Sequence, residues 1–178
     1  AGMKKAYLDY NATTPVDPRV LEAMMPYFKD GFGNPSSIHA FGSAARAALD
    51  EARERGAALL GAGAREILFT SGGSEGNNLA IKGAAFAEGG RGGKHMVTTR
   101  VEHDSTLEAF MFLESRGFTV TYLGVDRNGL VDLDELREAV TGETRLVSVI
   151  YANNETGTVM PVERIAGIVK EKGALLHV

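Results

Sequence analysis

The sequence predicts an α/β fold in which a mostly parallel sheet has helices on both faces. From about residue 66 onward, short apolar runs of strand character alternate with amphipathic segments of helical length. Such an alternation favours parallel strands joined by right-handed crossovers. The 178 residues, of which 44% are hydrophobic, are enough to bury the core of one domain.

The N-terminal part of the chain is predicted to hold two helices. Asp17 and Pro18 form a cap and first-turn pair for a helix that runs to about Phe28. A longer, alanine-rich helix begins near Phe41 and ends at Gly61, because glycine is the residue at which helices often stop.

The remainder of the chain supplies the alternating strands and helices. The predicted strands are Glu66–Thr70, His95–Thr99, Thr119–Leu123, Leu146–Tyr151 and Ala174–Val178. The predicted helices are Glu75–Ala87, Ser105–Arg116, Leu133–Val140 and Val162–Lys172.

Composition excludes several classes of function. With 19 basic and 23 acidic residues the net charge is −4, which gives no basic face for nucleic acid and no polybasic patch for a membrane surface. No apolar run approaches the roughly 20 residues that span a bilayer, and we expect a cytoplasmic protein. The chain has no cysteine, and its four histidines lack metal-ligand spacing, so we expect neither a disulfide nor a metal site.

The stretch Ile67–Lys82 is typical of a phosphate-binding turn between a strand and a helix. Glycines let the backbone approach a ligand, and the first amides of a helix point outward with the positive end of its dipole. Gly73 and Ser74 stand at this position, and the serine hydroxyl would add a donor. The alternative is an ordinary turn in which Ser74 is the helix N-cap.

Ligands of an open parallel sheet bind beyond the carboxyl ends of its strands. His103 follows the second predicted strand, and Asn154 follows the fourth, so both should lie near Ser74 along one edge. Each has a structural alternative, since His103 could belong to a helix-entry turn and Asn154 to a turn closed by Asx hydrogen bonds.

With these residues the sequence resembles the cysteine desulfurases of aminotransferase class V, which are pyridoxal-phosphate-dependent transferases that supply sulfur for iron–sulfur cluster assembly. The similar segments are YLDYNATTPVDP, FGNPSSIHAFG, ILFTSGGSEGNNLAI, EHDSTLEA, NGLVDLDEL, VSVIYANNETGTVMPV and LLHV. The resemblance implies the large domain of the fold-type-I transferases in incomplete form. It divides the chain into an N-terminal segment, residues 1–16, and the first half of the cofactor domain, residues 17–178.

The resemblance also assigns roles to individual residues. Gly73 and Ser74 match the pair that binds the cofactor phosphate, and His103 matches the histidine that stacks on the pyridine ring and is a candidate acid–base group. Asn154 matches an asparagine near the ring oxygen of the cofactor and the substrate carboxylate. Asn11 matches a position in a loop close to the substrate, as does its neighbour Ala12.

The family's reaction converts L-cysteine to L-alanine and leaves the sulfur as an enzyme persulfide, with pyridoxal phosphate as the electron sink. The family's Schiff-base lysine, persulfide cysteine, substrate-binding arginine and pyridine-pairing aspartate would all lie beyond Val178. Neither Lys82, two turns into a helix, nor Lys94, in a turn at the opposite edge, is positioned to replace that lysine.

We therefore expect the N-terminal portion of a cysteine desulfurase, catalytically incompetent by itself. Its expected partners are L-cysteine, the remainder of the polypeptide, a sulfur-acceptor or iron–sulfur scaffold protein, and a second copy in a homodimer. Two alternatives stay open: a non-catalytic assembly module that pairs with a separate chain, and a selenocysteine lyase or related cysteine lyase.

Overall fold

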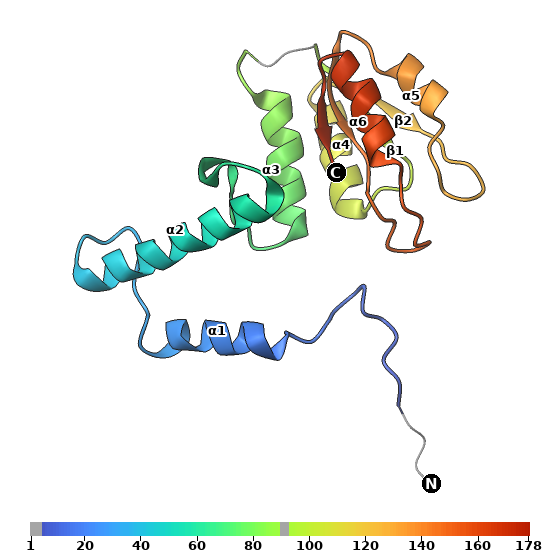
Figure 1. The fold of residues 1–178 in the computed structure, drawn as a ribbon. Helices are drawn as coiled ribbons and strands as arrows, with labels where there is room; N and C mark the ends of the chain where they lie inside the picture. The colour runs from blue at the N-terminus through green and yellow to red at the C-terminus, as the bar shows by residue number, and fades with distance from the viewer. Residues whose placement is uncertain (1–4, 90–92) are drawn as a thin grey trace. The chain divides into compact units, whose positions relative to one another are not determined.

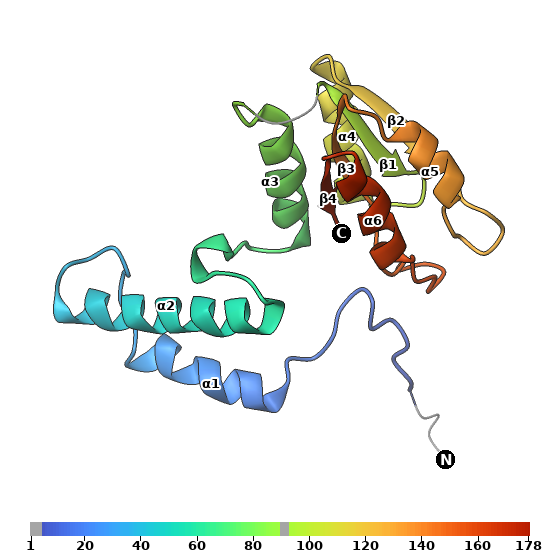
Figure 2. The same ribbon diagram turned by 45° about the horizontal axis from the view of Figure 1, so that its top comes forward.

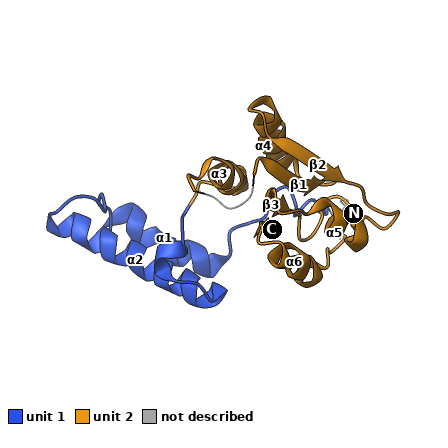
Figure 3. Ribbon diagram, turned by 90° about the horizontal axis from the view of Figure 1, so that it is seen from above, with its two compact units in different colours: residues 1–69 blue, residues 70–178 orange. Residues whose placement is uncertain are grey.

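The computed structural model describes residues 5–89 and 93–178 of the chain (Figure 1 and, turned by 45°, Figure 2). The chain forms two compact units, residues 1–69 (unit 1) and residues 70–178 (unit 2), which Figure 3 colours separately. The boundary expected after residue 16 stays a prediction.

Unit 1 contains the two predicted helices and a short 3₁₀ turn. These elements are α1 (Pro18–Lys29), α2 (Ala40–Leu60) and η1 (Ala64–Glu66). The Asp17 side chain accepts a first-turn amide of α1, and Gly61 ends α2 with a φ of +66°, a conformation that suits glycine because it has no Cβ. Both predicted helices are confirmed, with their caps.

Unit 1 has very little interior of its own. Among its described residues only Gly42 and Ala57 are buried. Large apolar side chains are exposed instead: Ile38 is 100% exposed, Leu8 90% and Leu59 87%. The helices of unit 1 are therefore supported mainly by local contacts.

Unit 2 is a four-stranded sheet with helices between its strands. In chain order its elements are α3 (Gly73–Phe86), β1 (His95–Thr99), α4 (Asp104–Ser115), β2 (Thr119–Leu123), α5 (Leu133–Ala139), β3 (Thr144–Ser148), α6 (Val162–Glu171) and β4 (Leu175–His177). The strand order is β2-β1-β3-β4 and every pair is parallel, as Figure 2 shows. The predicted fold class is confirmed.

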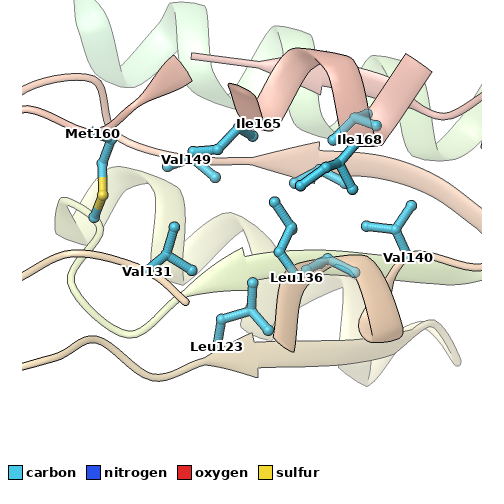
Figure 4. Close-up of a cluster of buried hydrophobic side chains, with 11 residues drawn as sticks. Leu123, Val131, Leu136, Val140, Val149, Met160, Ile165 and Ile168 are labelled. Carbon is cyan, nitrogen blue, oxygen red and sulfur yellow. The ribbon is translucent and has the colours of Figure 1, made fainter. Parts of the chain in front are cut away.

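Each face of this sheet carries its own hydrophobic core. On one face, side chains of α5 and α6, including Leu136 and Ile165, pack on Val97 and Val147 of the sheet (Figure 4). On the other face, α3 and α4 pack on Met96, Leu146 and their neighbours. Burial of alternate strand residues on opposite faces explains why the central strands read as continuous apolar runs.

One predicted strand is wrong. Glu66 lies in the 3₁₀ turn η1, and Ile67 to Thr70 have no strand partner within the described residues. Leu68 is 70% exposed and Phe69 55% exposed. The apolar run has the composition of a strand, but a strand exists only where a neighbour completes its hydrogen-bond ladder.

No helix within residues 5–89 and 93–178 is both long enough and apolar enough to cross a membrane.

Candidate active site

The strand order creates a crevice between β1 and β3. The chain leaves β1 toward β2 on one side and leaves β3 toward β4 on the other, so the loops that follow β1 and β3 diverge. Open α/β sheets bind ligands at such a switch point. A cavity of about 110 Å³ lies here, and its polar wall comes from α3, α4 and the strand ends: Asn77, Glu102, His103, Thr106, Tyr151 and His177.

His103 is the N-cap of α4, and hydrogen bonds fix its ring. The Ser105 amide donates to His103 Nδ1 (3.1 Å), and Ser105 Oγ lies 2.8 Å from the same atom. A nitrogen that accepts a backbone N–H carries no hydrogen, so the neutral ring carries its hydrogen on Nε2. Asn77 Nδ2 in turn donates to Ser105 Oγ (2.9 Å). The helix-entry interpretation is thus right for Nδ1, while Nε2 has no partner among the described residues.

Glu102 is a buried carboxyl group beside His103. The residue is only 8% exposed. Its Oε1 accepts hydrogen bonds from Thr99 Oγ1 (2.7 Å) and from the Ile150 amide (2.8 Å). Burial raises the pKa of this carboxyl, and the two hydrogen bonds oppose that effect in part. The bond to Ile150 ties the segment after β3 to the loop after β1.

His177 forms the wall of the cavity on β4. Its Nδ1 lies 2.8 Å from Ser148 Oγ on the neighbouring strand. Burial lowers the pKa of this imidazole, which favours the neutral ring at neutral pH.

The N-terminus of α3 has the features of an anion site. The N-cap is Gly72, not Ser74, so the interpretation of Ser74 as the cap is wrong. Within the part of the chain that the structure describes, the amides of Gly73 and Ser74 donate to no acceptor, and a Cβ added at Gly73 would meet no atom within 4 Å. Open space, two unused amides and a hydroxyl fit a phosphate group.

Ser71, in the same turn, is already engaged by a carboxylate. Its amide and hydroxyl donate to Glu75 Oε2 at 2.7 and 2.5 Å, and these bonds lower the pKa of Glu75. Within the described residues, Ser71 is therefore not available to a ligand, whereas the amides of Gly73 and Ser74 are.

The two asparagines after β3 have different environments. Asn153 is buried: its Oδ1 accepts the amides of Glu155 and Thr156 (2.9 Å each), and its Nδ2 donates to the Val101 carbonyl (2.9 Å). Asn154 is exposed, and its Nδ2 donates to Glu155 Oε1 (2.9 Å). The expected Asx turn is present, and Asn153 makes it.

Asn11 and Ala12 lie in unit 1, where the Ala12 amide closes a turn on the Asp9 carbonyl (3.2 Å). Their role near the substrate stays a prediction. The two lysines that the sequence argument set aside contact aromatic rings: Lys82 Nζ lies 4.3 Å from the Phe112 ring centroid and Lys94 Nζ 6.0 Å from that of Phe118.

Of the polar residues in the cavity wall, sequence reasoning assigned a role only to His103. It assigned none to Asn77, Glu102, Thr106, Tyr151 or His177. Asn77 stands one turn after Ser74, and a carboxylate directly after a buried strand is a signal that points to Glu102. Nothing in the local pattern around His177 separates it from a strand-end residue, because its role follows from the pairing of β4 with β3.

Comparisons with known proteins agree with this geometry. The family model described as aminotransferase class-V matches residues 6–178. A cysteine desulfurase of Trichormus azollae is 54% identical over 176 residues, which are 99% of this chain and 44% of that protein. The chain thus spans less than half the length of the curated relatives it matches.

Solved structures give the same picture. A NifS-like protein superposes with a TM-score of 0.92 and 42% identity, covering 98% of this chain and 48% of that one. A structure described as SspA in complex with cysteine has a TM-score of 0.89 and 44% identity, covering 97% of this chain and 50% of that one.

Proposed function

Because this chain belongs to the aminotransferase class-V family and matches the N-terminal portion of its cysteine desulfurases, we propose that it supplies the first half of a cysteine desulfurase active site. The reaction would release sulfur from L-cysteine as an enzyme-bound persulfide and leave L-alanine. The observation that carries the proposal is the switch-point crevice, which has a histidine with an unused Nε2 in its wall and which α3 also lines.

We propose that residues of this chain hold pyridoxal phosphate at two places, its phosphate and its ring. Gly73 and Ser74 would hold the phosphate through their unused amides and the serine hydroxyl. His103 would stack on the ring, and Asn154 would contact the ring oxygen. When bound, the cofactor supplies the electron sink that the cleavage of a carbon–sulfur bond requires.

The chain's own contribution to proton transfer centres on His103. Ser105 holds His103 Nδ1 as an acceptor, and Asn77 holds Ser105 from α3, so the ring cannot rotate freely. In this arrangement Nε2–H is a hydrogen-bond donor, and the ring can act as a general acid or base only when Nδ1 releases the Ser105 amide and takes the second proton itself.

The sulfur-accepting group must come from elsewhere, since the chain contains no cysteine. We propose that the chain alone is inactive and that turnover requires the remainder of the polypeptide. The finer expectations form part of the same proposal: a homodimer, a sulfur-acceptor or iron–sulfur scaffold partner, and a cytoplasmic location.

A chimera tests this proposal. Residues 1–178 are fused to the remaining C-terminal part of the Trichormus azollae cysteine desulfurase, and alanine and sulfide are measured with cysteine and pyridoxal phosphate. We expect turnover by the chimera and none by the 178-residue chain. Robust turnover by the chain alone would contradict its proposed incompleteness. A second, complementary peptide in the purified material would instead favour a module that pairs with a separate chain.

His103→Ala in the chimera should lower kcat by about 10² to 10⁴, the usual contribution of a general acid or base. The matched control is His39→Asn, because His39 caps α2 and asparagine is a good cap. A His103→Ala chimera as active as the control would remove His103 from the mechanism. Comparing L-cysteine with L-selenocysteine on the same chimera tests the selenocysteine lyase alternative.

A further inference from the structure

Two hydrogen bonds cross the switch point between the loop after β1 and the segment after β3. The Ile150 amide donates to Glu102 Oε1 (2.8 Å), and Asn153 Nδ2 donates to the Val101 carbonyl (2.9 Å). Glu102 and Asn153 are each only 8% exposed. Each is followed directly in the sequence by a candidate site residue, His103 in one loop and Asn154 in the other.

The backbone ladder does not hold these loops together. The register of β1 with β3 ends at Thr98 and Ser148. Beyond it the next backbone amides turn outward, since Arg100 bonds to the Leu123 carbonyl of β2. Likewise Val149 bonds to the His177 carbonyl of β4. Side chains therefore bridge the crevice just beyond the last paired residues of β1 and β3.

Both side chains are anchored on their own loop before they reach across. Glu102 Oε1 also accepts the Thr99 hydroxyl, and Asn153 Oδ1 accepts two amides of its own turn. In Asn153 the side-chain oxygen binds its own turn and the side-chain nitrogen reaches across, whereas in Glu102 the single atom Oε1 accepts from both sides. Each side chain is therefore a strut, that is, a side chain bonded to both loops at once. We propose that Glu102 and Asn153 are positioning residues that hold His103 and Asn154 at a fixed separation across the crevice.

Substitutions at Glu102 and Asn153 can remove or keep individual hydrogen bonds of the struts. Both donors to Glu102 use Oε1, so the amide oxygen of Glu102→Gln replaces it, whereas Glu102→Ala leaves the Ile150 amide and the Thr99 hydroxyl without their acceptor. Asn153→Asp keeps the acceptor of the turn but loses the donor to Val101. Glu108→Ala, at an exposed position on α4, is the control.

The first measurement is amide hydrogen exchange and ¹⁵N–¹H spectra of the 178-residue chain, which need no cofactor. In Glu102→Ala the Ile150 amide should exchange at least about tenfold faster, and the amide signals of His103 and Asn154 should shift. Glu102→Gln should restore both properties to nearly wild-type values. Asn153→Asp should shift the His103 signal while the turn amides of Glu155 and Thr156 stay protected.

The second measurement rests on the proposed function, because it uses two ligands as probes of the site. Inorganic phosphate probes the N-terminus of α3 alone, and pyridoxal phosphate probes that end together with the ring end. Glu102→Ala and Asn153→Asp should weaken pyridoxal phosphate binding about five- to tenfold and leave phosphate binding within about twofold. Glu108→Ala should change neither.

The outcomes separate the two proposals. If wild-type chain binds neither probe, the cofactor assignment fails, and the exchange and shift data still decide on the struts. A second outcome is that Glu102→Ala lowers the melting temperature, leaves the amide signals of His103 and Asn154 unchanged and weakens the binding of both probes equally. In that case Glu102 is a structural residue and the positioning role is wrong. Should Glu102→Ala not fold, Glu102→Gln and Asn153→Asp supply the decisive comparison. A positioning role requires that Glu102→Gln leave the amide signal of His103 unchanged and that Asn153→Asp shift it.

Discussion

Thr98 and Thr99 are adjacent, fully buried threonines at the end of β1 whose hydroxyl groups have opposite situations. Among the described residues, Thr98 Oγ1 is buried without a hydrogen-bond partner. Thr99 Oγ1 donates to Glu102 Oε1 (2.7 Å). An unpaired buried hydroxyl costs free energy, whereas one that satisfies a buried carboxyl contributes.

Thr98→Val should therefore raise the free energy of unfolding by about 1 kcal/mol, since valine keeps the shape and removes the unpaired group. Thr99→Val should lower it by about 1 to 2 kcal/mol and serves as the matched comparison. Urea unfolding of both variants measures the difference. Equal effects of the same sign would show that the hydroxyl of Thr98 is satisfied.

Glu102 should make stability depend on pH in a direction opposite to that of an ordinary surface carboxylate. Burial raises its pKa, so the folded state binds the proton more tightly than the unfolded state. Its contribution is fully present below the unfolded pKa, near 4.5, and is lost as the pH rises through the folded pKa. Glu102→Gln, which cannot ionise, should melt at a higher temperature than wild type at pH 7, and the difference should vanish toward pH 4.

Thermal melts of both proteins between pH 4 and 8 measure this effect. The partly buried histidines His95 and His177 have lowered pKa values, so their contribution to stability falls as the pH drops below about 6.5. Both histidines are present in the two proteins, and their effects cancel in the difference. A difference that is flat with pH would mean that Glu102 has the same pKa folded and unfolded.

At the scale of elements, α5 is a helix of seven residues and depends on its cap. The Asp132 side chain accepts the amides of Asp134 (2.8 Å) and Glu135 (3.2 Å), and the helix places Leu136 in the core. Asp132→Ala should cost about 1 kcal/mol. Asp134→Ala, in the same exposed first turn but without a cap, should cost a few tenths. Chemical denaturation distinguishes them, and equal losses would assign the effect to charge and not to capping.

The strands that the sequence predicted with the correct bounds are those packed against an adjacent helix. β1 and β2 have the predicted bounds because each contacts an adjacent crossover helix, so their apolar runs report their environment. β3 ends at Ser148, three residues before the predicted end at Tyr151. The run stays apolar there, but the Ile150 amide bonds to Glu102 and not to a strand, which no local pattern reveals.

The candidate site was predictable to the extent that it depends on strand order. His103 follows from its place after a central strand, and the unused amides of Gly73 and Ser74 follow from a glycine turn before a helix. The tautomer of His103 could not be predicted from the sequence, because it depends on Ser105 and Asn77, which come from different helices. Long-range hydrogen bonds of this kind are set by packing, and residue spacing along the chain carries no record of them.

The two units differ in how much of their helical structure is supported by a core, and this difference should appear in their stability. α1 and α4 are both 12 residues long, which makes them a matched pair. α1 buries no residue, whereas α4 buries four, including Phe110 and Leu113. A helix of this length is marginal in water without tertiary contacts, so its protection must come from packing.

Hydrogen-exchange mass spectrometry of the 178-residue chain at pH 7 should therefore show amides of α1 exchanging at least on the order of a hundredfold faster than those of α4, after correction for intrinsic rates. Amides of β1 and β3, between the two cores of unit 2, should be the slowest. Capping alone would protect α1 better, because α1 has a proline in its first turn and Asp17 before it. The expected order therefore follows from burial and not from capping. Equal protection of α1 and α4 would mean that unit 1 acquires a buried face in solution, for which its exposed Leu21, Met24 and Phe28 are the residues to probe next.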